Sequence, residues 1–185
     1  MIRDTPGLAD LLDSSFEFSV SRNEHGEAVR VASGASLEAI AGDGSGGTFF
    51  LCRGGDGHRP VVFASSEGQA GLIADDLQAA LEIITGLVAW QDCLKFSGGG
   101  SLDAMEAAHR LLERDMVSEE PEIATHRARV AADLALRDVP VPELLARLRD
   151  AVARTEPDYL VVSEAGDEYE SLFGRFRPSD NPNWR

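Results

Sequence analysis

The amino-acid sequence predicts an α+β fold: a single domain in which a mainly antiparallel sheet packs against helices. Strand-like segments dominate the first 65 residues, whereas apolar residues at helical spacing dominate residues 75–152. Two further short apolar segments flank a glycine turn close to the C-terminus. Strands followed by a block of helices are typical of α+β proteins and not of alternating βαβ units. We therefore expect a helical insert before a C-terminal hairpin.

The N-terminal region predicts a short helix or turn followed by a hairpin. Residues 7–13 are the helix or turn. Phe16, Phe18 and Val20 alternate with polar residues, which is the period of a strand. A polar, turn-forming stretch follows, and residues 28–31 then return as the second strand.

Three more strands are predicted around two glycine-rich connections. Residues 37–41 form the first strand, and the glycines of residues 42–47 end it. Residues 48–52 and 60–64 are short apolar runs joined by residues 53–58, which is a hairpin pattern. The first half of the chain therefore reads as an antiparallel meander.

Helical spacing begins after Asp75 and Asp76, and either side chain suits the N-cap position. Gly86 suits the C-terminus of that helix. Residues 87–96, which include Trp90, predict a further short helix.

A glycine-rich loop then leads into the helical insert. Ser101 is the expected N-cap of a helix after this loop, and Pro121 and Pro142 fit the first turns of two more helices. The helix that begins after Ser101 is expected to bury one face, made of Leu102, Met105, His109, Leu112 and Met116.

The chain is predicted to close with a hairpin of residues 159–162 and 169–173 around the turn at 164–167. Residues 1–173 then make one domain. Residues 174–185 contain three arginines, two prolines and no apolar period, so we expect a flexible C-terminal tail.

The chain is strongly acidic, with a formal net charge of −15. Residues 1–95 carry 14 acids and 6 bases, and the remainder carries 18 acids and 11 bases, so the charge is spread along the chain. Binding of nucleic acid or of an anionic membrane surface needs basic patches, so neither is expected. A basic protein partner would be attracted to such a surface.

The two cysteines, Cys52 and Cys93, lie far apart in apolar surroundings, which favours buried thiols and a reducing compartment. No apolar run approaches the length of about 20 residues that spans a bilayer. The N-terminal residues lack the apolar core of a signal peptide. We therefore expect a cytoplasmic protein.

The glycine-rich segment at residues 42–47 matches the dinucleotide pattern G-x-G-x-x-G. That pattern requires a helix directly after it, because the helix N-terminus binds the pyrophosphate. Here a strand-like run, residues 48–52, follows instead. The glycines are therefore predicted to form a sharp turn, and no cofactor is expected.

Metal-binding and nucleophilic patterns are equally incomplete. The aspartates at 43, 56, 75 and 76 lack the EF-hand spacing, and the four histidines fall in four separate segments. Ser45 lacks the glycine that a nucleophile elbow requires two residues earlier. We therefore expect no metal site and no enzyme.

An ordered set of motifs between residues 40 and 86 resembles the SUKH superfamily, which includes fungal cell-wall synthesis regulators and bacterial immunity proteins. The set comprises a Gly-Asp-Gly turn after a strand (residues 40–51), a strand (60–64), a short turn (66–68) and a helix with an Ala-Asp start (72–84). Residues 63–66 replace the aromatic-aspartate-histidine stretch that is common in the family.

The resemblance implies a non-catalytic protein that binds another protein. Its bacterial members are regarded as immunity proteins, each of which neutralises a cognate toxin, often a nuclease, by docking on it. An acidic inhibitor suits the basic active site of a nuclease. A regulatory or scaffold module of the same fold, and an acidic secretion chaperone, stay open as alternatives. The oligomeric state, monomer or homodimer, stays open too.

The expected partner-binding surface consists of acidic positions near strand ends and one aromatic anchor. A buried tryptophan often dominates a protein interface, and the alternative is that Trp90 packs between helix and sheet. The candidate residues are Asp43, Asp56, Glu67, Asp75, Asp76 and Trp90.

Overall fold

The computed structural model describes residue 2 and residues 5–53 and 57–174. Within these residues the chain forms one mixed α+β domain with six helices, a five-stranded sheet and a separate two-stranded sheet. The α+β prediction is therefore confirmed. The predicted tail lies outside the described residues except for Gly174.

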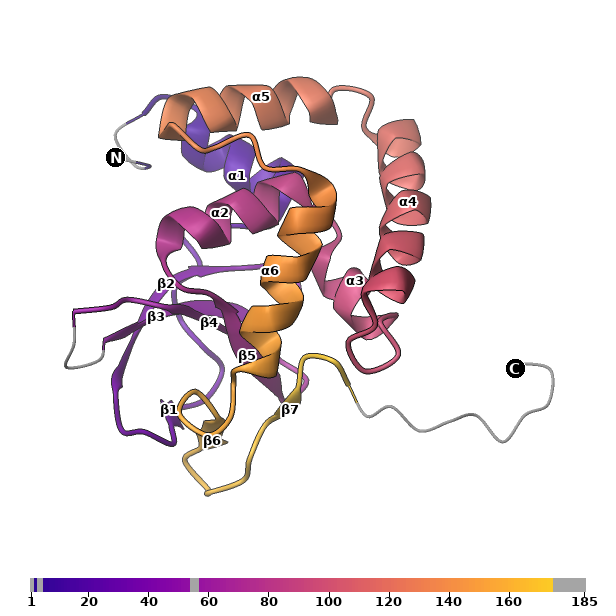
Figure 1. The fold of residues 1–185 in the computed structure, drawn as a ribbon. Helices are drawn as coiled ribbons and strands as arrows, with labels where there is room; N and C mark the ends of the chain where they lie inside the picture. The colour runs from indigo at the N-terminus through magenta and orange to yellow at the C-terminus, as the bar shows by residue number, and fades with distance from the viewer. Residues whose placement is uncertain (1, 3–4, 54–56, 175–185) are drawn as a thin grey trace.

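The larger sheet has the strand order β2-β3-β4-β5-β7. The strands β2 to β5 pair antiparallel with their neighbours, whereas β7 runs parallel to β5. Figure 1 shows the helices above this sheet and the β1–β6 pair below it. The bounds of the five strands are β2 Ser36–Gly42, β3 Thr48–Arg53, β4 Val61–Ala64, β5 Gln69–Ala74 and β7 Glu170–Ser171.

Both faces of the central strands are buried. Phe49 of β3 and Phe63 of β4 point to the face that the helices cover. Their neighbours Phe50 and Val62 point to the opposite face, where the two-stranded sheet of β1 (Val29–Val31) and β6 (Val161–Ser163) packs. Burial on both faces explains why β3 and β4 are continuous apolar runs.

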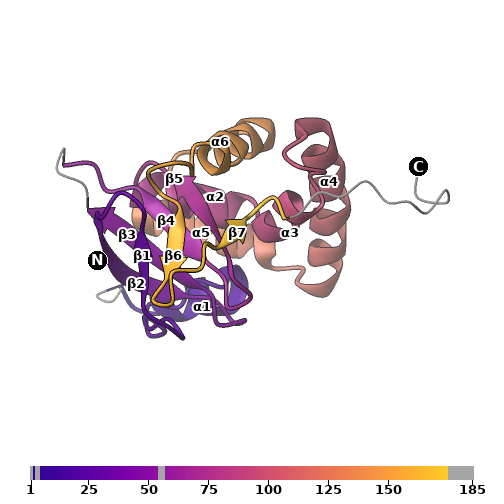
Figure 2. The same cartoon turned by 90° about the horizontal axis from the view of Figure 1, so that it is seen from below.

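The helices form the upper layer in Figure 1 and are spread along it in the orthogonal view of Figure 2. α5 crosses above α1 and α2, and a connection leads from its end across to α6, which descends onto β5; α4 stands beside α3. Their bounds are α1 Leu8–Phe16, α2 Leu77–Gly86, α3 Trp90–Lys95, α4 Leu102–Glu119, α5 Ile123–Leu134 and α6 Val141–Ala153.

Two predicted helix caps are confirmed. The Asp76 carboxylate accepts a hydrogen bond from the backbone N–H of Ala79 at 2.7 Å, and the Ser101 hydroxyl accepts one from Ala104 at 3.4 Å. Each cap satisfies a backbone donor that has no partner inside the helix.

The predicted N-terminal hairpin is wrong. α1 continues to Phe16, and Glu17 then ends it in the left-handed region with φ 50°. The predicted returning strand is β1, but it pairs with β6, more than 130 residues further along the chain. Leu8, Leu12 and Phe16 recur at helical spacing and are buried, so burial of that face outweighs the short alternation.

The region between residues 65 and 75 contains a strand, β5, that the sequence analysis did not identify. Residues 72–74 of β5 fall in the segment 72–84 that the SUKH resemblance counts with the helix. β5 lies between β4 and β7, and α6 packs on it. The Thr155 hydroxyl, just after α6, accepts a hydrogen bond from the backbone N–H of Leu72 at 3.0 Å.

The C-terminal segments do not form the simple hairpin that was predicted. A bridge between Val162 and Glu168 joins them, but β6 belongs to the two-stranded sheet and β7 to the larger one. The two segments therefore close different sheets.

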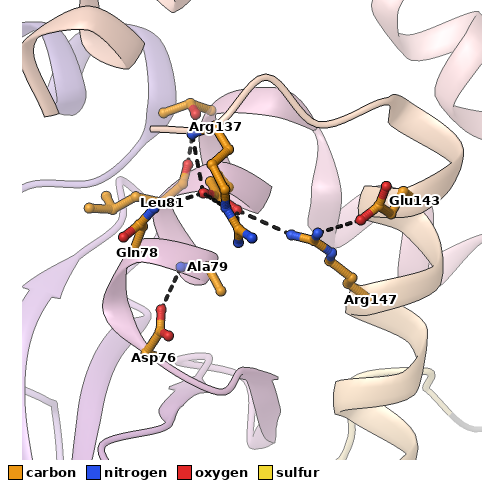
Figure 3. A network of polar contacts seen from close by, with 9 residues as sticks. Asp76, Gln78, Ala79, Leu81, Arg137, Glu143 and Arg147 are labelled. Atoms are coloured by element: carbon orange, nitrogen blue, oxygen red, sulfur yellow. Dashed lines mark hydrogen bonds and ion pairs between the residues drawn. The ribbon is translucent and has the colours of Figure 1, made fainter. Parts of the chain in front are cut away.

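The helical insert belongs to the same core as the sheet. Met105, Ile123 and Leu145 pack in one cluster with residues of α1, α2 and the sheet. A buried carboxylate on α2, Glu82, adds a polar tie to this packing. Arg137 approaches it from the α5–α6 connection and Arg147 from α6, as Figure 3 shows.

Candidate functional site

Two turns meet at one end of the larger sheet, because β3 and β4 pair antiparallel. Residues 43–47 connect β2 to β3, and residues 65–68 connect β4 to β5. The Ser66 hydroxyl donates a hydrogen bond to the carbonyl oxygen of Ser45 at 2.8 Å. This end of the sheet therefore presents a joined pair of turns next to α3.

Asp43 organises the first turn from inside. One carboxylate oxygen accepts hydrogen bonds from the backbone N–H and the hydroxyl of Ser45, both at 2.9 Å, and from the N–H of Gly47 at 2.7 Å. The other accepts one from the Gln91 amide at 3.2 Å. Asp43 is only 2% exposed, so it supports the turn and does not belong to the exposed surface that was predicted.

The glycine-rich segment is a turn between strands, as predicted, with β3 starting directly after Gly47. A Cβ atom at Gly47 would lie 2.4 Å from the ring of Phe63, so only glycine fits. This steric demand accounts for one of the glycines that imitate the nucleotide pattern.

A hollow of about 260 Å³ lies between these turns, α3 and the end of β7. Its apolar floor includes Trp90, which is 3% exposed and packs edge-to-face on Phe63 with ring centroids 5.1 Å apart. Glu67, Asp92 and Lys95 line it with charged groups. The remaining lining residues are Ser45, Ser65, Ser66, Gln69, Gln91, Leu94, Leu172 and Gly174.

Carboxylates near the hollow influence one another. Glu17 still reaches solvent, but partial desolvation, followed by the charge of Asp43, raises the pKa of its carboxyl group. Asp92 acts in the same direction, and Arg22 opposes both. The carboxylates of Glu17, Asp43 and Asp92 therefore lie close enough to interact on one side of the hollow.

The remaining predicted positions lie elsewhere. Asp75 and Asp76 follow β5 and so lie at the opposite end of that strand from Glu67. Asp75 pairs with Arg154 at 2.9 Å, and Asp76 caps α2. Asp56 lies outside the described residues. The structure thus brings Glu67 and Trp90 to one hollow, and does not bring Asp75 and Asp76 to them.

A serine, a histidine and a glutamate also meet between α1 and the start of α5. Nδ1 of His126 lies 3.1 Å from the Ser15 hydroxyl and 2.9 Å from Glu120, and Ser15 donates to Glu120 at 2.7 Å. A catalytic serine and its acid contact opposite ring nitrogens of the histidine. Ser15 and Glu120 contact the same nitrogen here, and the exposed carboxylate of Glu122 lies 3.8 Å from the other nitrogen, so the cluster ties α1 to the helical insert.

A second polar chain holds the segment before β1 against the sheet. His25 contacts the Thr48 hydroxyl at 3.0 Å and the Tyr169 hydroxyl at 3.2 Å, and Tyr169 donates to Glu27 at 2.5 Å. Burial, followed by the bond to Glu27, raises the pKa of Tyr169 to about 12. No local sequence signal predicts either cluster, since each one joins two segments that are more than 100 residues apart.

Within the residues that the structure describes, no group of three or more histidine, cysteine, aspartate or glutamate side chains is placed to hold a metal ion. No helix in that part of the chain has both the length and the apolarity needed to cross a bilayer. Comparison of the chain with known protein families, curated proteins and solved structures finds no match.

Proposed function

We propose that this protein acts by binding a basic protein partner, with the hollow between the two turns and α3 at the centre of the contact. The observation that carries this proposal is a hollow lined by the buried rings of Phe63 and Trp90 and by the acidic residues Glu67 and Asp92, in a chain of net charge −15. In keeping with the SUKH resemblance, we propose that the protein is an immunity protein and the partner a toxin.

Two physical arguments support a protein partner. An apolar centre surrounded by polar and charged groups is the usual composition of a protein interface. A strongly negative surface accelerates encounter with a positively charged partner and disfavours acidic ones. A toxin that holds phosphate groups would offer such a positive surface.

The test is co-expression of this chain with each product of its neighbouring genes in the source genome. The proposal expects one product that arrests growth when expressed alone and is tolerated with this chain. The purified pair should form a complex whose association rate falls by about tenfold as salt is raised. If no neighbouring product is toxic and none forms a complex, the proposal is wrong.

A further inference from the structure

We infer that the hollow is a socket for a single arginine side chain of the partner. The inference rests on the proposed function for the source of that arginine, but the socket itself follows from size, lining and charge. At about 260 Å³ the hollow is smaller than the pockets of about 300–1,000 Å³ that hold drug-sized ligands. One long side chain is the ligand that this space suits.

The floor suits the stem of such a side chain. Phe63, Trp90, Leu94 and Leu172 are buried residues that line the hollow. The stem of an arginine is apolar and packs on such surfaces while its charged end stays among polar groups. A short acidic or polar side chain would leave this floor uncovered.

The edge suits a guanidinium group. The carboxylates of Glu67 and Asp92 accept hydrogen bonds, and so do the side-chain oxygens of the serines and glutamines that line the hollow. A guanidinium has five donors in one plane, whereas an ammonium has three around one point. Many acceptors spread around one hollow therefore favour arginine over lysine.

The balance of charge favours a cation despite Lys95, which also lines the hollow. Glu67 and Asp92 outnumber Lys95 among the lining residues, and Asp43 and Glu17 add two negative charges nearby, against the one positive charge of Arg22. Asp43 also holds the amide of Gln91 by a hydrogen bond, so one wall of the hollow is positioned before a ligand arrives.

The first experiment titrates the full chain with Nα-acetyl-arginine methylamide at low salt and follows backbone and indole N–H signals by NMR. The sequence continues from Gly174, which lines the hollow, into Arg175 and Arg177. The titration is therefore repeated with the Arg175→Gln/Arg177→Gln variant, so that the protein's own arginines cannot mask the result.

The socket predicts saturable shifts of the Trp90 indole and of the Gln91 and Lys95 amides in at least one of these two proteins. The corresponding lysine and citrulline compounds should produce weaker shifts. Glu67→Gln/Asp92→Asn should weaken arginine binding by about fivefold, since two weak, exposed ion pairs are lost together.

The matched control removes two exposed carboxylates elsewhere, in Glu164→Gln/Glu168→Gln. This control should retain arginine binding. The inference is overturned if neither protein shows shifts at the hollow, if lysine binds as well as arginine, or if both double variants weaken binding equally.

A second experiment separates this inference from the proposed function. Once a neighbouring gene product is shown to bind, its affinity is measured for Glu67→Gln/Asp92→Asn and for the control. If Glu67→Gln/Asp92→Asn leaves the affinity for the partner unchanged, the socket is ruled out and the proposed function is still supported. If no neighbouring gene product binds, the proposed function is ruled out. The titration with the arginine compound still decides whether the socket exists.

Discussion

The side-chain amide of Gln91 donates a hydrogen bond to the buried carboxylate of Asp43 at 3.2 Å and so joins α3 to the turn between β2 and β3. This bond links the sheet to the helix that carries Trp90. Asp43, which the sequence predicts as a partner-binding residue, is therefore an internal support of the candidate site.

Asp43→Asn should destabilise the fold by about 1–3 kcal/mol, because the amide group cannot accept every hydrogen bond that the carboxylate accepts. Urea unfolding followed by tryptophan fluorescence measures the change. Glu164→Gln, an exposed change, is the control and should stay within about 0.5 kcal/mol of the wild type. An unchanged midpoint for Asp43→Asn would contradict the structural role.

Glu82→Gln should cost about 2 kcal/mol of unfolding free energy. Glu82 has a side chain only 1% exposed and binds Arg137 and Arg147, which come from two other parts of the chain. Breaking a fully buried pair costs about 3–5 kcal/mol, and the partial exposure of both arginines reduces that figure. Calorimetry or urea unfolding gives the value.

The control for Glu82 is Glu143→Gln, which removes the exposed carboxylate that pairs with Arg147 within α6. Such surface pairs contribute about 0.3–0.5 kcal/mol. Equal losses for the two variants would mean that burial of Glu82 contributes nothing.

Stability should fall as pH is lowered from 7.5 to 5.5. Burial lowers the pKa of His25 and of His109, against the opposing charges of Glu27 and Glu113. Below about 6.5 the unfolded chain therefore binds protons more readily than the folded chain, and stability is lost until pH reaches the native pKa values. Well above pH 6.5 both histidines are neutral in the folded and the unfolded chain, so they add no pH dependence to the stability.

The size of this effect is about 1.4 kcal/mol for each unit by which a native pKa lies below its unfolded value. Unfolding free energies of the wild type and of His25→Gln/His109→Gln, measured across the same pH step, test it. The double variant should lose less stability than the wild type, and an equal loss would assign the pH dependence to other groups.

Gly86→Ala should cost about 1–3 kcal/mol through overpacking. A Cβ atom at this position would lie 2.3 Å from Cδ1 of Leu144, which is itself buried on α6. In a Gly86→Ala/Leu144→Ala variant the clash disappears, so the combined cost should be less than the two single costs together. Gly26→Ala, where no atom lies within 4 Å, is the control and should leave Tm nearly unchanged.

Elements with local signals were predictable from the sequence. α2 has its cap at Asp76 and its apolar period, and α4 has its cap at Ser101. The glycine-rich turn before β3 was recognised because a strand-like run follows it. Each of these features depends on residues a few positions apart, so the sequence records them directly.

The short strands β1, β6 and β7 lie on segments predicted as strands, but their partners were not predictable in the same way. β1 and β6 have three residues each and β7 has two, which is too few to show which strand each one pairs with. The β1–β6 pair covers the lower face of the larger sheet, and β7 covers its edge at β5. These apolar surfaces exist only once the larger sheet has formed, so no local pattern records the pairing. β5 was missed because its last residues run straight into α2.

The candidate site shows the same division. Glu67 and Trp90 were named from the sequence, but Asp92, which lies two residues after Trp90, was not. Asp43 was named for an exposed role that its burial removes. Proximity to glycines marked the turn correctly, whereas no property of the sequence shows which way an aspartate in a turn will face.

The sequence by itself determined the α+β class, the acidic charge, the caps of α2 and α4 and the turn at residues 42–47. Only the tertiary structure decided that β1 pairs with β6, that Asp43 lies inside, and that Glu67, Asp92 and Trp90 line one hollow. The physical reason is range. Helix caps and turns are satisfied within a few residues, whereas sheet partners and hollows depend on which distant apolar surfaces are buried together.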